Sequence, residues 1–201
     1  MKYGKLTLGQ VEAIVNKLGG EEGVRCFLAG EVVVEEPIFP LLEFISKITV
    51  SVTKTVIAKT VFVKDVSKKA KVRVSYLGPS FENLFLVWPR QIEDPIGETT
   101  LNYHKLTKDS LDAPIIALLG GKAKAETTLA EVYALMVKQG EGQGGALLTN
   151  GYGNIFYVLN NGCVLCAVIV YWNDDGWLVE SCLFEYRHWW RAGYRVFSRT
   201  S

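Results

Sequence analysis

The sequence predicts an α+β fold, with an N-terminal helical hairpin followed by a mainly antiparallel β-sheet core that contains two or three short helices and a C-terminal β-meander. Three observations support this prediction. Apolar residues recur at helical spacing in the first thirty residues. Apolar and polar residues alternate from Ile48 to Thr53, as in a half-buried strand. The sequence Asn160-Asn161-Gly162 separates two apolar stretches, which is typical of a β-hairpin.

Two short helices are predicted within the first thirty residues. Thr7 and Gln10 have the spacing of a capping box at the start of the first helix, and Gly19-Gly20 ends it because glycine accepts the left-handed conformation. Glu21-Glu22 begin the second helix, where negative charge is favourable. One side of these helices carries the apolar residues Leu8, Val11, Ile14, Val15, Leu18, Val24, Phe27 and Leu28.

A connector with two prolines, Pro37 and Pro40, follows the hairpin and is expected to extend to residue 47. It divides the chain into residues 1–36, which hold the hairpin and the start of the connector, and residues 37–201, which form the α+β core. A further division of the core near 140–145 stays open, because four glycines within Gly140–Gly145 predict a flexible loop.

Three strands are predicted in the first half of the core, at 48–53, 55–63 and 72–76. The connections between them are too short for helical crossovers, so we expect them to pair antiparallel. Residues 99–106 are predicted to add another strand.

Three helices are predicted in the core. Gly78-Pro79 opens a short one, and Asp112 caps a second that has Pro114 in its first turn. Thr128 and Glu131 form another capping box, at the start of a helix that ends near Gln139. The remaining residues are predicted to form the meander, with strands at 155–159, 163–172, 177–183 and 194–198.

The composition gives no sign of a specialised partner or compartment. Lysine and arginine total 22 against 21 acidic residues, so no global charge favours nucleic acid or membranes. Four cysteines are too few for a disulfide scaffold. The N-terminus lacks the apolar stretch of a signal peptide, and the longest apolar run, Val164–Trp172, is too short to span a bilayer as a helix. We therefore expect a cytoplasmic protein that does not bind membranes.

The string Leu6–Gly20 (LTLGQVEAIVNKLGG), with Val74–Gly78, Glu126–Glu131 and the ending Arg195–Arg199 (RVFSR), resembles a set of uncharacterised small bacterial proteins. The resemblance implies a bacterial, cytoplasmic origin. It assigns no activity, cofactor or functional residue.

Cys163 and Cys166 form a C-x-x-C, with Cys182 and His188 downstream. Zinc needs four converging ligands, but residues three apart on a strand point to opposite faces. A redox pair would precede a helix, and no helix is predicted here. The favoured interpretation is buried cysteine on a strand, so no metal and no cofactor are predicted.

No recognisable catalytic motif accompanies the two histidines, His104 and His188. Gly140–Gly145 lacks the lysine of a phosphate-binding loop. The sequence therefore points to no catalytic residue. An enzyme of unidentified type stays an alternative, and a histidine within hydrogen-bond reach of a cysteine or a carboxylate would support it.

The leading hypothesis is a non-catalytic binding or adaptor protein that uses the N-terminal hairpin as a docking element. The alternative is binding of single-stranded nucleic acid through a basic and aromatic face. That face would form a continuous groove if the third and last strands were neighbours. Part of that face is the arginine-aromatic tail, Phe184–Arg199, in which arginines are interleaved with aromatic residues. The tail equally suits a protein interface, or a terminal strand with its aromatic rings inward. The candidate residues are Lys68, Lys69, Lys71, Arg73, Arg187, Trp189, Trp190 and Arg191.

Overall fold

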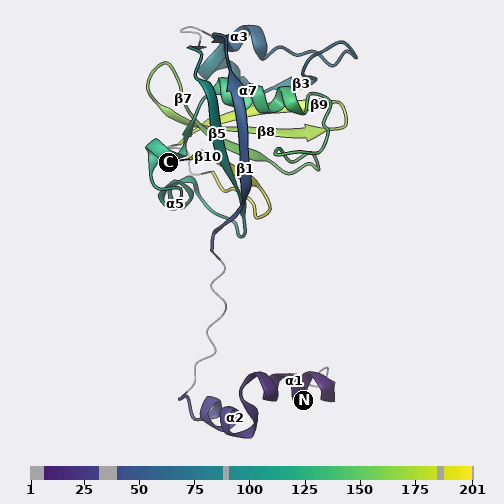
Figure 1. Cartoon of the computed structure of the whole chain (residues 1–201), viewed down its shortest axis with the longest axis vertical. Coiled ribbons are helices and arrows are strands. Elements are labelled where there is room, and N and C mark those ends of the chain that lie inside the picture. The colour runs from purple at the N-terminus through teal and green to yellow at the C-terminus, as the bar shows by residue number, and fades with distance from the viewer. Residues whose placement is uncertain (1–6, 32–39, 88–90, 185–187, 201) are drawn as a thin grey trace. The chain divides into compact units, whose positions relative to one another are not determined.

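The computed structural model describes residues 7–31, 40–87, 91–184 and 188–200 (Figure 1). Contacts within the chain divide it into two compact units, one that ends at Phe39 and one that begins at Pro40. Each unit is described by itself. In the described ranges, no helix has the length and apolar character needed to cross a membrane.

The first unit contains the predicted helical hairpin, formed by α1 (Leu8–Lys17) and α2 (Gly20–Leu28). The predicted capping box is confirmed, because the Thr7 hydroxyl accepts from the Gln10 backbone N–H and the Gln10 side chain accepts from the Thr7 N–H. Neither helix has a buried residue.

The second unit is built on a mixed, mostly antiparallel sheet of eight strands, and the α+β prediction is confirmed. Seven strands follow the order β1-β5-β10-β7-β8-β9-β3, and β6 also pairs with β7. A separate pair is formed by β2 and β4. The strands are β1 (Leu42–Val52), β2 (Val56–Ile57), β3 (Val74–Leu77), β4 (Ile92–Glu93), β5 (Gly97–Leu106), β6 (Glu126–Thr127), β7 (Asn154–Leu159), β8 (Leu165–Asn173), β9 (Gly176–Leu183) and β10 (Arg195–Arg199).

Helices cover both faces of this sheet. They are α3 (Ala58–Val61), α4 (Pro79–Phe81) with the π-helical turn η1 (Glu82–Leu86), α5 (Asp112–Leu118), α6 (Lys122–Ala125) and α7 (Leu129–Lys138). On β7, Phe156 and Val158 join the core under α7, whereas Ile155 and Tyr157 join the core under α5. The sheet twists strongly, so that β1 and β5 cross the direction of β8 and β9 in Figure 1. The core is therefore divided by the sheet into two apolar layers.

The predicted pairing of the first strands is wrong. Residues 55–63 form only the short β2 before the chain turns into α3. β1 pairs with β5 and starts at Leu42, inside the expected connector, while β3 pairs parallel with β9. Both pairings join segments far apart in the sequence. Short connections favour pairing between neighbours, but strand pairing depends on side-chain packing across the whole sheet, which the local sequence does not specify.

The C-terminal meander is confirmed for β7, β8 and β9, which pair antiparallel in order. The turn at Asn160 is formed as predicted, with the Asn160 N–H donating to Val164 O. β10 does not extend the meander. It lies between β5 and β7, antiparallel to the first and parallel to the second.

The glycine-rich segment 140–145 is a loop, as predicted, and Gly142 within it is closely packed. The Gln139 side chain donates to Gln143 O at 2.6 Å and to Leu147 O at 3.0 Å. Gly142 has φ +73°, and a Cβ there would lie 2.1 Å from the Trp172 ring. Glycine is needed at this position for close packing and a left-handed backbone. The flexibility of the loop stays a prediction.

Replacing Thr128 with alanine should lower the free energy of unfolding by about 0.5–2 kcal/mol, because the α7 capping box is formed as predicted. The Thr128 hydroxyl accepts from the Glu131 N–H at 3.2 Å, and Glu131 accepts from the Thr128 N–H at 2.7 Å. Urea unfolding would measure the change. Thr128→Ser keeps the hydroxyl and is the control, so an equal loss in both variants would contradict this role.

Candidate functional site

The predicted basic and aromatic face is not continuous. β3 forms one edge of the sheet, and β7, β8 and β9 separate it from β10. Arg73, just before β3, donates to Asp175 O at 3.0 Å and stacks over the Trp172 ring. The third and last strands are not neighbours, so Lys68, Lys69, Lys71 and Arg73 lie away from the arginine-aromatic tail.

The two adjacent tryptophans of the tail have opposite environments. Trp190 is 2% exposed, and its indole Nε1 donates to Asp112 Oδ1 at 2.6 Å. Its prediction as a surface residue is therefore wrong, because its ring belongs to the core under α5. Trp189 is 63% exposed. Arg191 is also exposed, and Arg187 lies outside the described residues.

The C-x-x-C does not form a paired site. Cys163 is exposed in the turn with φ +57°, while Cys166 is buried in β8. The expectation of buried strand cysteine thus holds for Cys166 and is wrong for Cys163. Burial raises the pKa of Cys166 to about 11 and that of Cys182 to about 12, so both are protonated at neutral pH. The described residues contain no group of three or more metal ligands.

The two histidines have different surroundings, since His104 is half-buried and His188 is exposed. His104 packs edge-on against Phe44, and burial lowers its pKa. The ring of His188 lies 4.4 Å from that of Trp190. Among the described residues, no hydrogen bond joins either ring to a cysteine or a carboxylate. The enzyme alternative stays untested.

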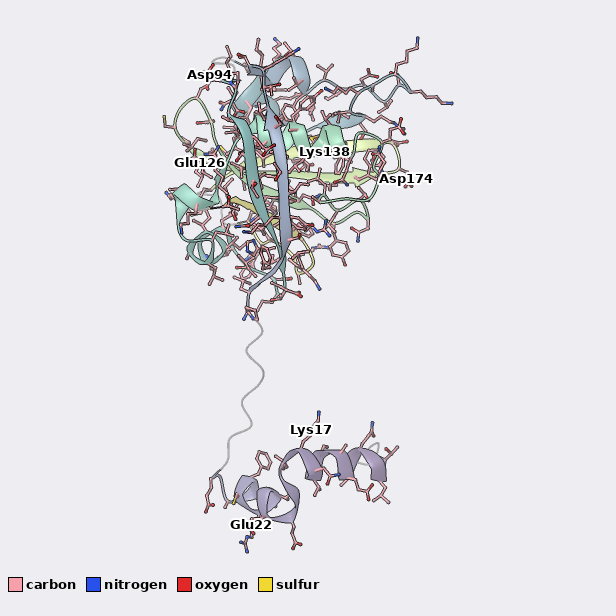
Figure 2. The ribbon with its side chains drawn as sticks, viewed as in Figure 1. Lys17, Glu22, Asp94, Glu126, Lys138 and Asp174 are labelled. Carbon is pink, nitrogen blue, oxygen red and sulfur yellow. The ribbon has the colours of Figure 1, made fainter. Side chains whose placement is uncertain are left out.

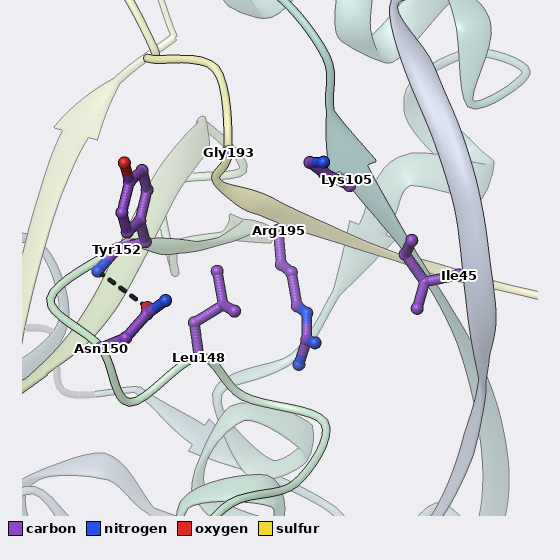
Figure 3. A pocket seen from close by; sticks show the side chains of 7 residues that line it. All are labelled: Ile45, Lys105, Leu148, Asn150, Tyr152, Gly193 and Arg195. Atoms are coloured by element: carbon purple, nitrogen blue, oxygen red, sulfur yellow. Dashed lines mark hydrogen bonds between the residues drawn. The ribbon is translucent and has the colours of Figure 1, made fainter.

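The structure instead presents two adjoining hollows at the end of the sheet where β7 and β10 begin. One, of about 320 Å³, is shown in Figure 3. The other has about 450 Å³ and shares Asn150 and Tyr152 with it. We call them together the arginine pocket. Its lining residues are Ile45, Lys105, Asp109, Leu148, Asn150, Gly151, Tyr152, Arg191, Ala192, Gly193, Tyr194 and Arg195.

The segment that carries both arginines is held by backbone hydrogen bonds. Trp190 exchanges two with Ser110, and Gly193 N–H donates to Leu106 O at 2.7 Å. Ala192 N–H donates to the Asp109 carboxylate at 2.8 Å. Gly193 has φ +94°, and a Cβ there would lie 2.7 Å from the Tyr152 ring. The buried Trp190–Asp112 contact anchors the same segment, so the pocket wall is fixed by the core.

Arg195 is the most constrained cation of the pocket. Its Nη1 donates to Gly145 O at 2.9 Å and to Ala146 O at 2.5 Å, and its guanidinium lies 5.1 Å from the Tyr103 ring centre. Burial lowers its pKa. Figure 3 shows its side chain running between Leu148 and Ile45. In the described part of the chain, no carboxylate lies within 4 Å of it.

Lys105 stands directly opposite Arg195 in the β5–β10 register. Side chains directly opposite each other share one face of the sheet, and like charges in this arrangement are unfavourable. Glu43 is the β1 partner of Lys105, but the two form no ion pair within 4 Å. Lys105 and Arg195 are therefore adjacent cations, and in the described residues neither forms an ion pair with a carboxylate within 4 Å.

A second hollow, of about 560 Å³, lies beside α3 and α7. We call it the lysine pocket. Three lysines line it, including Lys138 at the end of α7 (Figure 2). The other two are Lys54 and Lys71, and the apolar lining includes Val56, Val61, Tyr133 and Val137. Of the residues of the predicted basic and aromatic face, Lys71 lines this hollow.

Comparisons of the chain with protein-family models, with curated proteins and with solved structures find no match. The resemblance to uncharacterised bacterial proteins stays a prediction.

Proposed function

We propose that this chain is a non-catalytic binding or adaptor protein and that its N-terminal hairpin is the docking element. One observation supports the proposal most directly: the hairpin is folded, with a formed capping box, yet its apolar side is open to solvent. Leu8 and Leu28 are 79% and 78% exposed, and Val11, Ile14 and Phe27 are exposed as well. Contiguous exposed apolar residues are characteristic of interaction sites.

The chemistry of the hairpin favours a protein partner with an apolar groove that has a basic rim. Amphipathic helices dock by placing their apolar side in such grooves. Residues 7–31 contain four glutamates against Lys17 and Arg25, a net charge of 2 − 4 = −2. Arg25 is already paired with Glu22 at 2.6 Å. The remaining acidic groups would steer the hairpin toward a basic rim.

Deleting residues 1–36 should leave the melting temperature of the core unchanged and abolish partner capture. The reason is that the chain divides into two compact units, with the boundary between Phe39 and Pro40. Calorimetry would measure the first effect and a pull-down the second. In the full chain, Leu8→Ser with Leu28→Ser should lose the same partner, while Lys17→Ser should retain it.

Two outcomes would contradict the proposal. A deletion that unfolds the core would make the hairpin part of the fold. A full chain that is dimeric by light scattering, and monomeric after the two leucine substitutions, would show that the hairpin pairs with its own copy instead of a different protein.

A further inference from the structure

We infer that the arginine pocket binds a small organic molecule that carries a phosphate monoester. This inference concerns the core alone, so it is independent of the docking role of the hairpin.

The lining of the pocket is positively charged. Lys105 and Arg195 line the first hollow, which has no acidic lining residue, and Arg191 lines the second together with Asp109. The Asp109 carboxylate already accepts from the Ala192 N–H at 2.8 Å. The lining therefore has a net charge of 3 − 1 = +2. A phosphate monoester has a charge between about −1.5 and −2 at neutral pH, which matches this excess better than a single carboxylate does.

The donors needed to bind an oxyanion are present. A guanidinium has five N–H donors in a planar fork, and the carbonyls of Gly145 and Ala146 accept from Nη1 of Arg195 only. Within the described residues, Nε and Nη2 of Arg195 have no hydrogen-bond partner. The carbonyl contacts orient the fork in advance, so little side-chain entropy is lost when an anion binds.

The remaining lining fits the organic part of such a molecule. Leu148 and Ile45 flank Arg195 on two sides (Figure 3). The Tyr152 ring is 45% exposed and lines both hollows. A ring attached to the phosphate could stack on Tyr152, while Asn150 offers an amide to polar substituents. The loop that carries these residues is held by hydrogen bonds of its own, from Leu148 N–H to Asn154 Oδ1 at 2.7 Å and from Tyr152 N–H to Asn150 Oδ1 at 3.3 Å. Less ordering is therefore needed when a ligand binds.

The lysine pocket is the main competitor for an anion, because three lysines line it. Their ammonium groups are exposed, and the described residues show no hydrogen bond that orients them. A test must therefore separate the two pockets by substitution.

The test is titration of the full chain with phenyl phosphate, followed by calorimetry and by amide shifts in NMR spectra. We expect saturable binding, with the largest shifts at Asn150, Gly151 and Gly193. Benzoate, with the same ring and one charge, should bind about 10-fold more weakly, as should inorganic phosphate, which lacks the ring.

Substitutions locate the site. Lys105→Gln and Arg191→Gln should each weaken binding of phenyl phosphate about 10-fold, because each removes a charged donor from an exposed position. Arg195→Lys keeps the charge, loses the fork and should have a similar effect. The matched control is Lys47→Gln. It removes an exposed charge from β1 on the other face of the sheet and should leave binding within about twofold.

The inference is overturned if phenyl phosphate does not saturate, or if Lys47→Gln weakens binding as much as Lys105→Gln does. Loss of binding in Lys138→Gln, with no loss in Arg191→Gln, would place the anion in the lysine pocket and also overturn it. Equal affinity for benzoate would refute the assignment of a phosphate. None of these results bears on the hairpin.

Discussion

Replacing Trp190 with alanine is expected to lower the free energy of unfolding by about 3–5 kcal/mol. The indole is 2% exposed and packs in the apolar layer under α5, together with Ile115 and Ile155. Its removal leaves a cavity that the surrounding side chains can fill only in part. It also removes the indole N–H that donates to Asp112. Urea unfolding followed by circular dichroism would measure the loss.

Trp189 is the matched control for this substitution. It is the neighbouring residue and has the same side chain, but it is 63% exposed. Trp189→Ala should therefore change the free energy of unfolding by no more than about 0.5 kcal/mol. Equal losses in the two variants would contradict the burial of Trp190. Trp190→Phe, which keeps most of the ring volume, should fall between them because it loses only the donor and part of the packing.

Asp112→Ala should destabilise the protein by about 2–5 kcal/mol. Asp112 is 3% exposed, and its Oδ1 accepts from the Tyr157 hydroxyl at 2.8 Å and from the Trp190 indole at 2.6 Å. Alanine leaves two buried donors without an acceptor, each of which costs about 1–3 kcal/mol. Asp112→Asn keeps a carbonyl oxygen at the same position and should lose much less. An equal loss in both variants, measured by urea unfolding, would refute the hydrogen-bonding role.

The buried Asp112 carboxyl also makes the stability of the protein depend on pH. Burial raises the pKa of Asp112 above its usual value of 3.8, and the hydrogen bonds from Trp190 and Tyr157 and the charge of His188 oppose this only in part. The folded state therefore binds the proton more tightly than the unfolded state. The corresponding stability is fully present below pH 3.8 and is lost as the pH rises through the folded pKa. The wild type should lose stability relative to Asp112→Asn over that range.

Local signals in the sequence predicted α1, α2, α4, α5 and α7, but not the four-residue helices α3 and α6. The capping boxes at Thr7 and Thr128 are formed, because both partners of each lie within one turn of the chain. The turn after β7 was also found, since its asparagine and glycine residues specify it locally. α5 begins where it was predicted, although Asp112 does not cap it. Leu111 is the N-cap, and the Asp112 side chain is used by the core.

Strand pairing and the pocket could not be predicted in the same way. β3 pairs with β9 about one hundred residues later, and nothing in the residues of β3 specifies that partner. The arginines of the tail stand out in the sequence, but Lys105 joins Arg195 only through the β5–β10 register. The burial of Trp190 likewise depends on Asp112, 78 residues away. Such contacts are determined by tertiary packing, which overrides local pattern.

The central place of β10 has a consequence for the order in which the protein folds. β10 is the last strand in the sequence, yet it alone joins the β1–β5 pair to β7 in the sheet. During vectorial synthesis, the two portions of the sheet emerge before β10. The edge of β5 that pairs with β10 is then unpaired, and the corresponding edge of β7 is covered only in part, by β6. Only when residues 195–199 have left the ribosome can the strands close into one sheet. Until then, these edges are open to edge-to-edge association.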